Sequence, residues 1–470
     1  MTTSVPRGDT APPSSEAGWK SYLADLWKAP ASAKAALAGC LLLMLVSPSG
    51  LSAMTTFIVP AFAKDTGAAK SAGILVFVSI PLLIGPIVLP FAGRWVDRLG
   101  ARKVAIPSAV LYAALTALVP LCGSSVPTLA VVLILASVFG FMSGLAVVFK
   151  VVSTWLPQHR GIGFALIGVA SSVAAAVFSP VFQWLISGSA DLGWKGTYVL
   201  VAAAIALVAI PTTVFLISEP TEPTEPVEQT RRMEPTGRME LTEAMEPTKR
   251  HMTGPEAELP RLPGIPLGRA VRTRVWISIT VSLAFAAAGP MTVRQNAVDF
   301  FGERGFDEAT VSLSLSALFA ASVVGLVVGG MILDRTDRPR VVVPMLAAVP
   351  VGLLTAFLNH GSAPLLFFAM ILLGFATGAE SSLGPFLVAR YFGLASFAQL
   401  QGLTLAISTL SLGMSPFLVS AAQTATGSYT VPVLALTALT VVAVVLAAVL
   451  PKFPPPWKAE NAPDQTTEPA

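Results

Sequence analysis

The chain has 470 residues, of which 54% are hydrophobic and only 12% are charged, and its mean hydropathy is +0.73. So little charge cannot coat a soluble globule of this length, so the composition excludes a soluble protein and indicates one surrounded by lipid. The net charge of +4 does not indicate a nucleic-acid binder, because the basic residues are scattered over short loops without a basic stripe interleaved with aromatic residues.

Twelve apolar runs are long enough to cross a membrane as helices, which predicts an all-α polytopic membrane protein. Residues 1–34 precede them as a cytoplasmic tail with a short amphipathic stretch near 19–27, and residues 451–470 follow as a second cytoplasmic tail. Proline or glycine inside several runs, as at 47–50, Pro81, Pro180, Pro290 and Pro416, predicts kinks rather than breaks. The runs lie near 35–63, 71–92, 104–122, 127–154, 161–187 and 194–218, then near 275–300, 308–333, 341–358, 364–389, 401–423 and 430–450.

Residues 219–273 separate the two sets of six runs and contain four Glu-Pro-Thr units. This composition cannot bury a core, so we interpret the segment as a disordered cytoplasmic linker between two six-helix bundles, 35–218 and 274–450. The alternative is a docking site for a regulator.

The distribution of Lys and Arg in the short loops predicts the orientation. Nine basic residues lie in loops on the side of both termini and four in the opposite loops, which places the termini and the linker in the cytoplasm of a cell whose inner membrane the chain spans.

The two halves repeat each other with an offset of roughly 235 positions, as expected of a transporter built around a pseudo-twofold axis. Gly140 and Gly144 correspond to Gly374 and Gly378, and the dipeptide Ser179-Pro180 corresponds to Ser415-Pro416.

The loop after the second helix of each half carries the most specific motif. In the first half, the loop has the pattern Gly-x-x-x-Asp-Arg-x-Gly-x followed by two basic residues, where x is any residue. This pattern resembles the signature loop of the major facilitator superfamily. The second copy keeps Gly, Asp-Arg and two arginines. The resemblance implies the twelve-helix fold of that family and alternating access. The motif residues are Gly93, Asp97, Arg98, Gly100, Arg102 and Lys103 in the first copy, and Gly330, Asp334, Arg335, Arg338 and Arg340 in the second.

We expect these motif residues to act as a gating latch. Gly93 would allow two helices to approach closely, and Asp97 would pair with an arginine and with the N-terminus of a neighbouring helix. The alternative is that the basic residues only enforce the topology.

Within the superfamily, the segments 155–161 and 390–393 resemble the monocarboxylate-porter and oxalate/formate-antiporter branch. That branch typically holds carboxylates with an arginine in the eighth helix, whereas the eighth and eleventh runs here carry no basic residue before their loops.

Ionisable residues inside apolar runs mark candidate binding sites, because a charge in the bilayer is costly without a partner or water. Arg294, with Gln295 and Asn296 beside it, is the candidate for gripping a carboxylate with two parallel hydrogen bonds, the alternative being a side chain that reaches to the interface. Glu380 is the candidate for carrying a proton or pairing with Arg294, the alternative being a buried structural contact.

Two further candidates lie nearer the ends of their runs. Lys150 is a possible second anion contact and Gln183 a possible cavity residue, and interfacial roles are the alternatives for both. Asp299 is expected in a loop at the mouth of the pathway.

These features predict a monomeric, proton-coupled secondary transporter of a small organic anion, without a cofactor. Efflux of a hydrophobic compound and a non-transporting sensor with the same fold are the alternatives. The sequence contains no metal-spaced cluster, nucleophile elbow or phosphate-binding loop, so we do not expect an enzyme.

Overall fold

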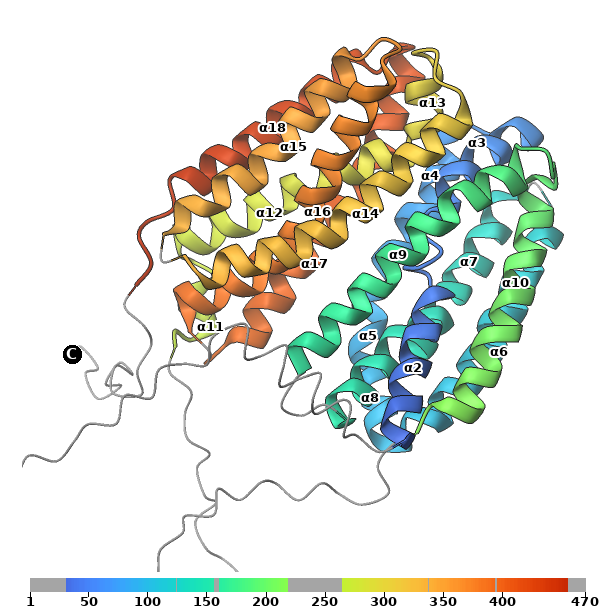
Figure 1. The fold of residues 1–470 in the computed structure, drawn as a ribbon, viewed down its shortest axis with the longest axis horizontal. Coiled ribbons are helices and arrows are strands. Elements are labelled where there is room, and N and C mark those ends of the chain that lie inside the picture. Colours follow the sequence, from blue (N-terminus) through green and yellow to red (C-terminus); the bar gives the residue numbers. More distant parts are fainter. Residues whose placement is uncertain are drawn as a thin grey trace, which may run out of the picture.

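The computed structural model describes residues 31–123, 125–155, 160–218, 264–336, 338–393 and 395–454. Within these ranges all named elements are helices, and they form two bundles, one from each half of the chain (Figure 1). The predicted twelve-helix, two-bundle fold is therefore confirmed. The amphipathic stretch near 19–27 and most of both the linker and the second tail lie outside the described residues.

The first bundle contains the elements up to residue 216. In chain order these are α2 (Ala31–Leu45), α3 (Met54–Thr66), α4 (Lys70–Ile74), η1 (Leu75–Ser79), α5 (Ile80–Leu99), α6 (Ala101–Leu118), η2 (Val119–Cys122), α7 (Val126–Phe141), η3 (Met142–Ala146), α8 (Val147–Trp155), α9 (Arg160–Ile186), α10 (Gly193–Pro211) and η4 (Thr212–Leu216).

The second bundle begins with a short helix at the end of the linker. Its elements are α11 (Leu267–Ala270), α12 (Arg274–Gln295), α13 (Ala297–Gly302), α14 (Glu308–Asp334), η5 (Pro339–Val341), α15 (Val342–Leu358), α16 (Ala363–Phe392), α17 (Phe397–Thr426) and α18 (Thr430–Ala448).

Eleven helices in the described ranges are long and apolar enough to cross a membrane, and each coincides with a predicted run. The remaining run, the first, is divided into α2 and α3 by turns at 46–53, so the prediction of a kink is wrong there. The Ser47 hydroxyl donates to the Met44 carbonyl at 2.8 Å and accepts from the Gly50 amide at 3.2 Å, which replaces part of the lost helical hydrogen bonding. In contrast, α9, α12 and α17 continue through Pro180, Pro290 and Pro416, as predicted.

The end of the linker also differs from the prediction. Residues 264–273 are ordered: Gly264 pairs with Gly393, and the Ile265 amide donates to the Phe392 carbonyl at 2.9 Å. The Thr273 hydroxyl then accepts from the Trp276 amide and caps α12. This last part of the linker is therefore attached to the end of α16.

Glycines bring α14 and α16 into backbone contact. A Cβ built at Gly378 would lie 1.9 Å from the Ser322 carbonyl oxygen, and one at Gly374 would lie 2.0 Å from that of Leu318. At Gly325 the corresponding distance, to the Phe375 carbonyl, is 2.1 Å. These glycines therefore set the spacing of the two helices, because a larger residue would force the helices apart.

The described polar contacts between the bundles lie near one side of the molecule. Because the helices alternate in direction, the end of α9 and the start of α14 lie opposite the side where α2 begins and α18 ends. We call this the opposite side, and the other the termini side. Figure 1 shows α3, α4 and α13 close together on the opposite side.

Four cross-bundle contacts form what we call the opposite-side seal. The Ser179 hydroxyl donates to the Ser312 carbonyl at 2.9 Å, and the Ser316 hydroxyl donates to the Ala176 carbonyl at 2.7 Å. The Thr56 hydroxyl donates to the Arg294 carbonyl at 3.1 Å, and Lys70 pairs with Asp299 at 2.5 Å. Asp299, predicted in a loop, thus lies in α13. Because these contacts join the two bundles near the opposite side, this conformation is closed on that side.

Candidate functional site

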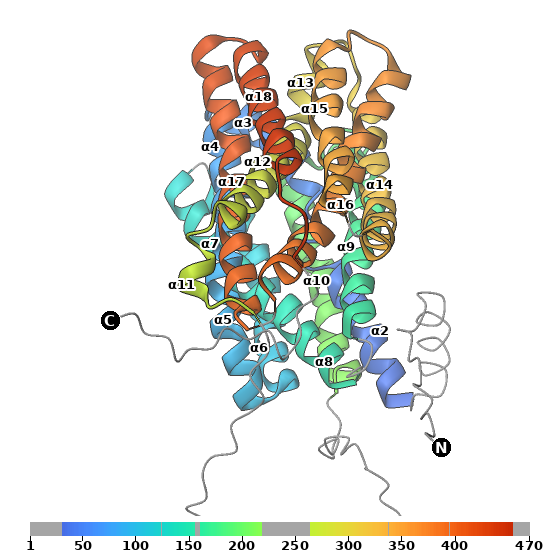
Figure 2. The same ribbon diagram turned by 90° about the vertical axis from the view of Figure 1, so that its left-hand side faces the viewer.

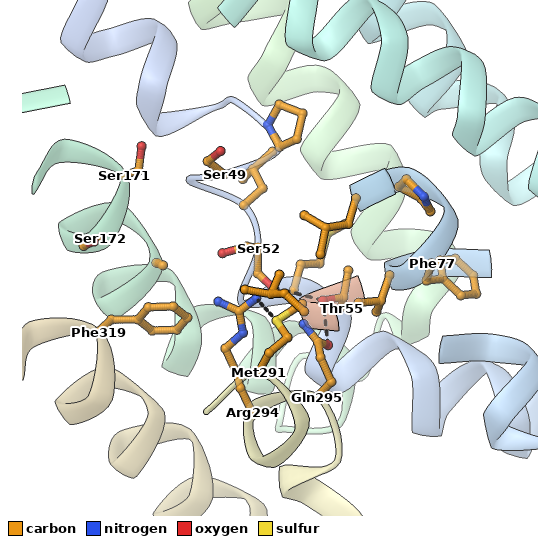
Figure 3. A pocket seen from close by; sticks show the side chains of 18 of the residues that line it. Ser49, Ser52, Thr55, Phe77, Ser171, Ser172, Met291, Arg294, Gln295 and Phe319 are labelled. Atoms are coloured by element: carbon orange, nitrogen blue, oxygen red, sulfur yellow. Dashed lines mark hydrogen bonds between the residues drawn. The ribbon is translucent and has the colours of Figure 1, made fainter. Parts of the chain in front are cut away.

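Figure 2 shows the helices of the two bundles from a second direction. A cavity of about 530 Å³ lies between the bundles (Figure 3). Both bundles line it, with residues from the break between α2 and α3, from η1 and from α5, α6, α7, α9 and α10 on one side, and from α12, α14, α16 and α17 on the other. Most of these side chains are apolar, and the polar ones are few. Such a chamber suits a small molecule with an apolar body held by a small number of polar groups.

Arg294, on the last turn of α12, points into this cavity between Met291 and Phe319 (Figure 3). Its Nη2 donates to the Met291 sulfur at 2.8 Å, and its guanidinium carbon lies 5.4 Å from the centre of the Phe319 ring. Its Nε is buried and has no hydrogen-bond partner in the described part of the chain. A buried donor without a partner is costly, so this edge of the guanidinium is prepared for an acceptor that a ligand would supply.

Gln295 also lines the cavity, but its side chain is already engaged. Its Oε1 accepts from the Thr55 hydroxyl of α3 at 3.0 Å, across the interface between the bundles. Gln295 therefore joins the cavity to the opposite-side seal.

Glu380 lines the same cavity from α16 and is half-buried. Among the described residues it forms no ion pair within 4.0 Å, so the predicted pairing with Arg294 is not formed in this conformation. Its carboxyl is available to a proton or to a ligand.

Hydroxyl groups of the first bundle line the same cavity, and sequence reasoning missed them. Ser49 and Ser52 come from the break between α2 and α3, and Ser171 and Ser172 from α9 (Figure 3). The only sequence signal was the Ser-Pro-Ser-Gly segment at 47–50, because a helix break exposes polar groups.

Three predicted binding residues do not line the cavity. Asn296 is buried in the joint between α12 and α13, where its Nδ2 donates to the Thr292 carbonyl at 3.0 Å. Gln183 lies near the opposite-side end of α9, beyond the seal residue Ser179, and Lys150 lies on α8, towards the termini side. Their roles as binding residues stay predictions, because position along an apolar run does not fix which way a side chain faces.

The gating motif forms a helix end and a tight turn. α5 continues to Leu99, and Gly100 turns the chain into α6 with a φ of +88°, a conformation that favours glycine. Arg102 donates to the Val214 carbonyl of η4, a contact within the first bundle. Arg98, Lys103, Arg335, Arg338 and Arg340 are exposed.

The close helix approach expected at Gly93 is absent in this conformation. A Cβ at Gly93 would meet no described atom within 4 Å, and one at Gly330 would first meet the Ser382 hydroxyl at 4.0 Å. The side chains of Asp97 and Asp334 lie outside the described residues. The latch hypothesis therefore stays a prediction for the conformation that is closed on the termini side.

Two membrane-spanning bundles that enclose a central cavity and are sealed on one side define a polytopic transporter. The chain belongs to the Major Facilitator Superfamily, whose family profile matches residues 40–301 and 295–469. It is a multi-pass membrane protein and a transporter rather than an enzyme.

Curated relatives are similar at low identity. The chain is 26% identical over 154 residues to the uncharacterized MFS-type transporter YcxA of Bacillus subtilis, covering 31% of this chain and 35% of the relative. It is 27% identical over 260 residues to an MFS-type transporter of Aspergillus fumigatus, covering 55% of each. It is 24% identical over 357 residues to the MFS transporter asaE of Aspergillus flavus, covering 74% of this chain and 69% of the relative. The chain thus spans about a third and about half of the first two relatives.

Solved structures confirm the fold. The crystal structure of a bacterial homologue of the human lysosomal transporter Spinster, in an inward-facing and unoccupied conformation, superposes with a TM-score of 0.59 at 15% identity, covering 90% of this chain and 95% of that one. The inward-facing, occupied structure gives 0.57 at 14% identity, covering 88% and 94%.

Proposed function

We propose that this transporter moves a small carboxylate-type organic anion across the inner membrane by alternating access, coupled to protons. The observation that carries the proposal is Arg294, a cation in a largely apolar cavity, whose buried Nε has no hydrogen-bond partner among the residues that the structure describes. A carboxylate is the ligand that a guanidinium edge matches best, because it accepts two parallel charge-assisted hydrogen bonds.

Glu380 supplies the proton coupling in this proposal. A bare carboxylate in an apolar cavity is costly, so a proton or a bound ligand must compensate its charge. In this proposal the opposite-side seal is one half of the alternating-access cycle. While the seal is closed, the cavity would exchange substrate with the termini side, which the positive-inside rule predicts to be cytoplasmic. The monomeric state and the monocarboxylate-porter resemblance also stay predictions.

Proteoliposome uptake of a panel of aliphatic and aromatic acids under an imposed pH gradient tests this function. We expect Arg294→Gln to reduce uptake roughly 10- to 100-fold, since hydrogen bonds to charged groups are among the strongest in proteins. Glu380→Gln should abolish the dependence on the pH gradient while leaving counterflow of the same acid. Acid uptake that is unchanged in Arg294→Gln would refute the anion site, and gradient-driven uptake that is unchanged in Glu380→Gln would refute the proton role.

Export of a hydrophobic compound is the second candidate, favoured by the apolar lining of the cavity, which includes Phe77, Phe141 and Phe319. In that case Arg294→Gln would leave transport of neutral aromatic compounds intact. A sensor with this fold would bind a ligand in the purified state and never move it.

A further inference from the structure

The contact between Arg294 and Met291 carries a further inference, which rests on the proposed function. Nε and Nη2 form one edge of a guanidinium, the edge that a carboxylate can engage with two parallel bonds. Here Nη2 donates to the Met291 sulfur at 2.8 Å, whereas the buried Nε has no partner in the described structure. A thioether is only a weak acceptor, so this edge is occupied by a group that a ligand could displace.

The geometry points to Met291 as a positioning residue that occupies part of the anion site while it is empty. Arg294 and Met291 are three residues apart on α12, so their side chains lie on one face of the helix. Phe319 of α14 lies on the other side of the guanidinium and holds it from across the bundle. An incoming carboxylate would take Nε and replace the Met291 sulfur at Nη2.

This role makes a prediction that a packing role does not make. If Met291 competes with the ligand for Nη2, carboxylate affinity must fall as the acceptor at position 291 becomes stronger. Leucine offers no acceptor, methionine a weak one, glutamine a neutral amide oxygen and glutamate a carboxylate. All four have similar length and volume, so a side chain that only fills space would not produce this order.

The experiment measures dissociation constants for the purified full-length protein by isothermal titration calorimetry. The probes are benzoate and hexanoate, and their neutral isosteres benzamide and hexanamide serve as reference ligands. We expect Met291→Leu to bind the acids about two- to threefold more tightly, Met291→Gln roughly tenfold more weakly, and Met291→Glu below detection. Binding of the amides should change less than twofold across the series.

Matched controls use Met345, which is 3% exposed, compared with 6% for Met291, and which does not line the cavity. Met345→Leu and Met345→Gln introduce the same chemical changes in a similarly buried position and should leave acid affinity unchanged. If the glutamine variant of Met291 does not fold, the direction of the leucine effect still decides, because a packing defect weakens binding and a removed competitor strengthens it.

The outcomes separate this inference from the proposed function. Acid binding that is lost in Arg294→Gln but flat across the Met291 series would overturn the role of Met291 alone. A wild-type protein that binds neither acid, or that binds both equally well after Arg294→Gln, would overturn the proposed function and this inference with it.

Discussion

Replacing Gly378 with alanine should destabilise the second bundle, although the exchange adds only one methyl group. A methyl group there would lie 1.9 Å from the Ser322 carbonyl oxygen of α14, a backbone atom that cannot rotate away. Reaching even 3.0 Å, below which Cβ contacts are essentially never seen, requires α14 and α16 to separate by roughly 1.1 Å at this point. Neighbouring contacts at Gly374 and Gly325 would open as well.

Overpacking of this kind costs about 1–3 kcal/mol. For a bundle of this size each kcal/mol corresponds to about 2–4 °C in melting temperature, so we expect Gly378→Ala to lower Tm by about 5 °C. The assay is thermal unfolding of the detergent-purified protein, followed by intrinsic fluorescence at one fixed scan rate because membrane proteins often unfold irreversibly.

Gly402→Ala is the matched control. Gly402 also lies inside a long helix, α17, but a Cβ there would meet no described atom within 4 Å. Alanine favours a helix over glycine by about 1 kcal/mol, so this variant should melt at the same temperature as the wild type or slightly higher. Equal melting temperatures for the two alanine variants would show that backbone contact does not determine the α14–α16 spacing.

Three further predictions concern the ends of the helices. Lys70→Ala should weaken the opposite-side seal. An impermeant reagent added from that side should then label a cysteine placed in the cavity up to about fivefold faster, and the charge swap Lys70→Asp with Asp299→Lys should restore the wild-type labelling rate. The Thr310 hydroxyl and amide lower the pKa of Asp307, which caps α14, so its stabilising effect is full above the ordinary carboxyl pKa and is lost as pH falls through the lowered value. Asp307→Ala should therefore reduce Tm at pH 7, and by progressively less as the pH is lowered below the ordinary carboxyl pKa. Phe453→Ala should accelerate hydrogen exchange at the end of α16, where the Phe453 ring packs, and leave exchange in α10 unchanged.

The helical fold could be predicted from the sequence because each span must be long and apolar, and few other structures satisfy the backbone in lipid. The break between α2 and α3 could not be predicted, because it depends on packing between helices. A Cβ at Gly140 of α7 would lie 2.7 Å from the ring of Pro48, so the broken segment occupies space that α7 leaves open. The sequence shows Pro48 and Gly140 but not that they touch.

The candidate site could be predicted in part. Arg294 and Glu380 were found because a charge in an apolar run is costly and must face a cavity or a partner. Lys150 satisfies this criterion less strictly, because it lies nearer a helix end where interfacial water is within reach, and Gln183 is polar but uncharged. The serines were missed because a hydroxyl can bond to its own helix backbone, so its presence in a run indicates nothing about a cavity.

The distribution of polar groups around the cavity has a consequence for transport. The charged lining residues, Arg294 and Glu380, belong to the second bundle, whereas the first bundle contributes hydroxyls such as those of Ser52 and Ser171. An anion bound as proposed would keep its strongest contact with one rigid body. Of the anion's own contacts, rocking would exchange only neutral hydrogen bonds, each worth about 1 kcal/mol. The same turn of α12 also holds the seal, because the Arg294 carbonyl accepts from Thr56 of α3. Ligand binding and opposite-side opening would therefore act on the same helical turn. A movement of Arg294 on binding the anion would directly affect the Thr56 hydrogen bond, which must break for the opposite side to open.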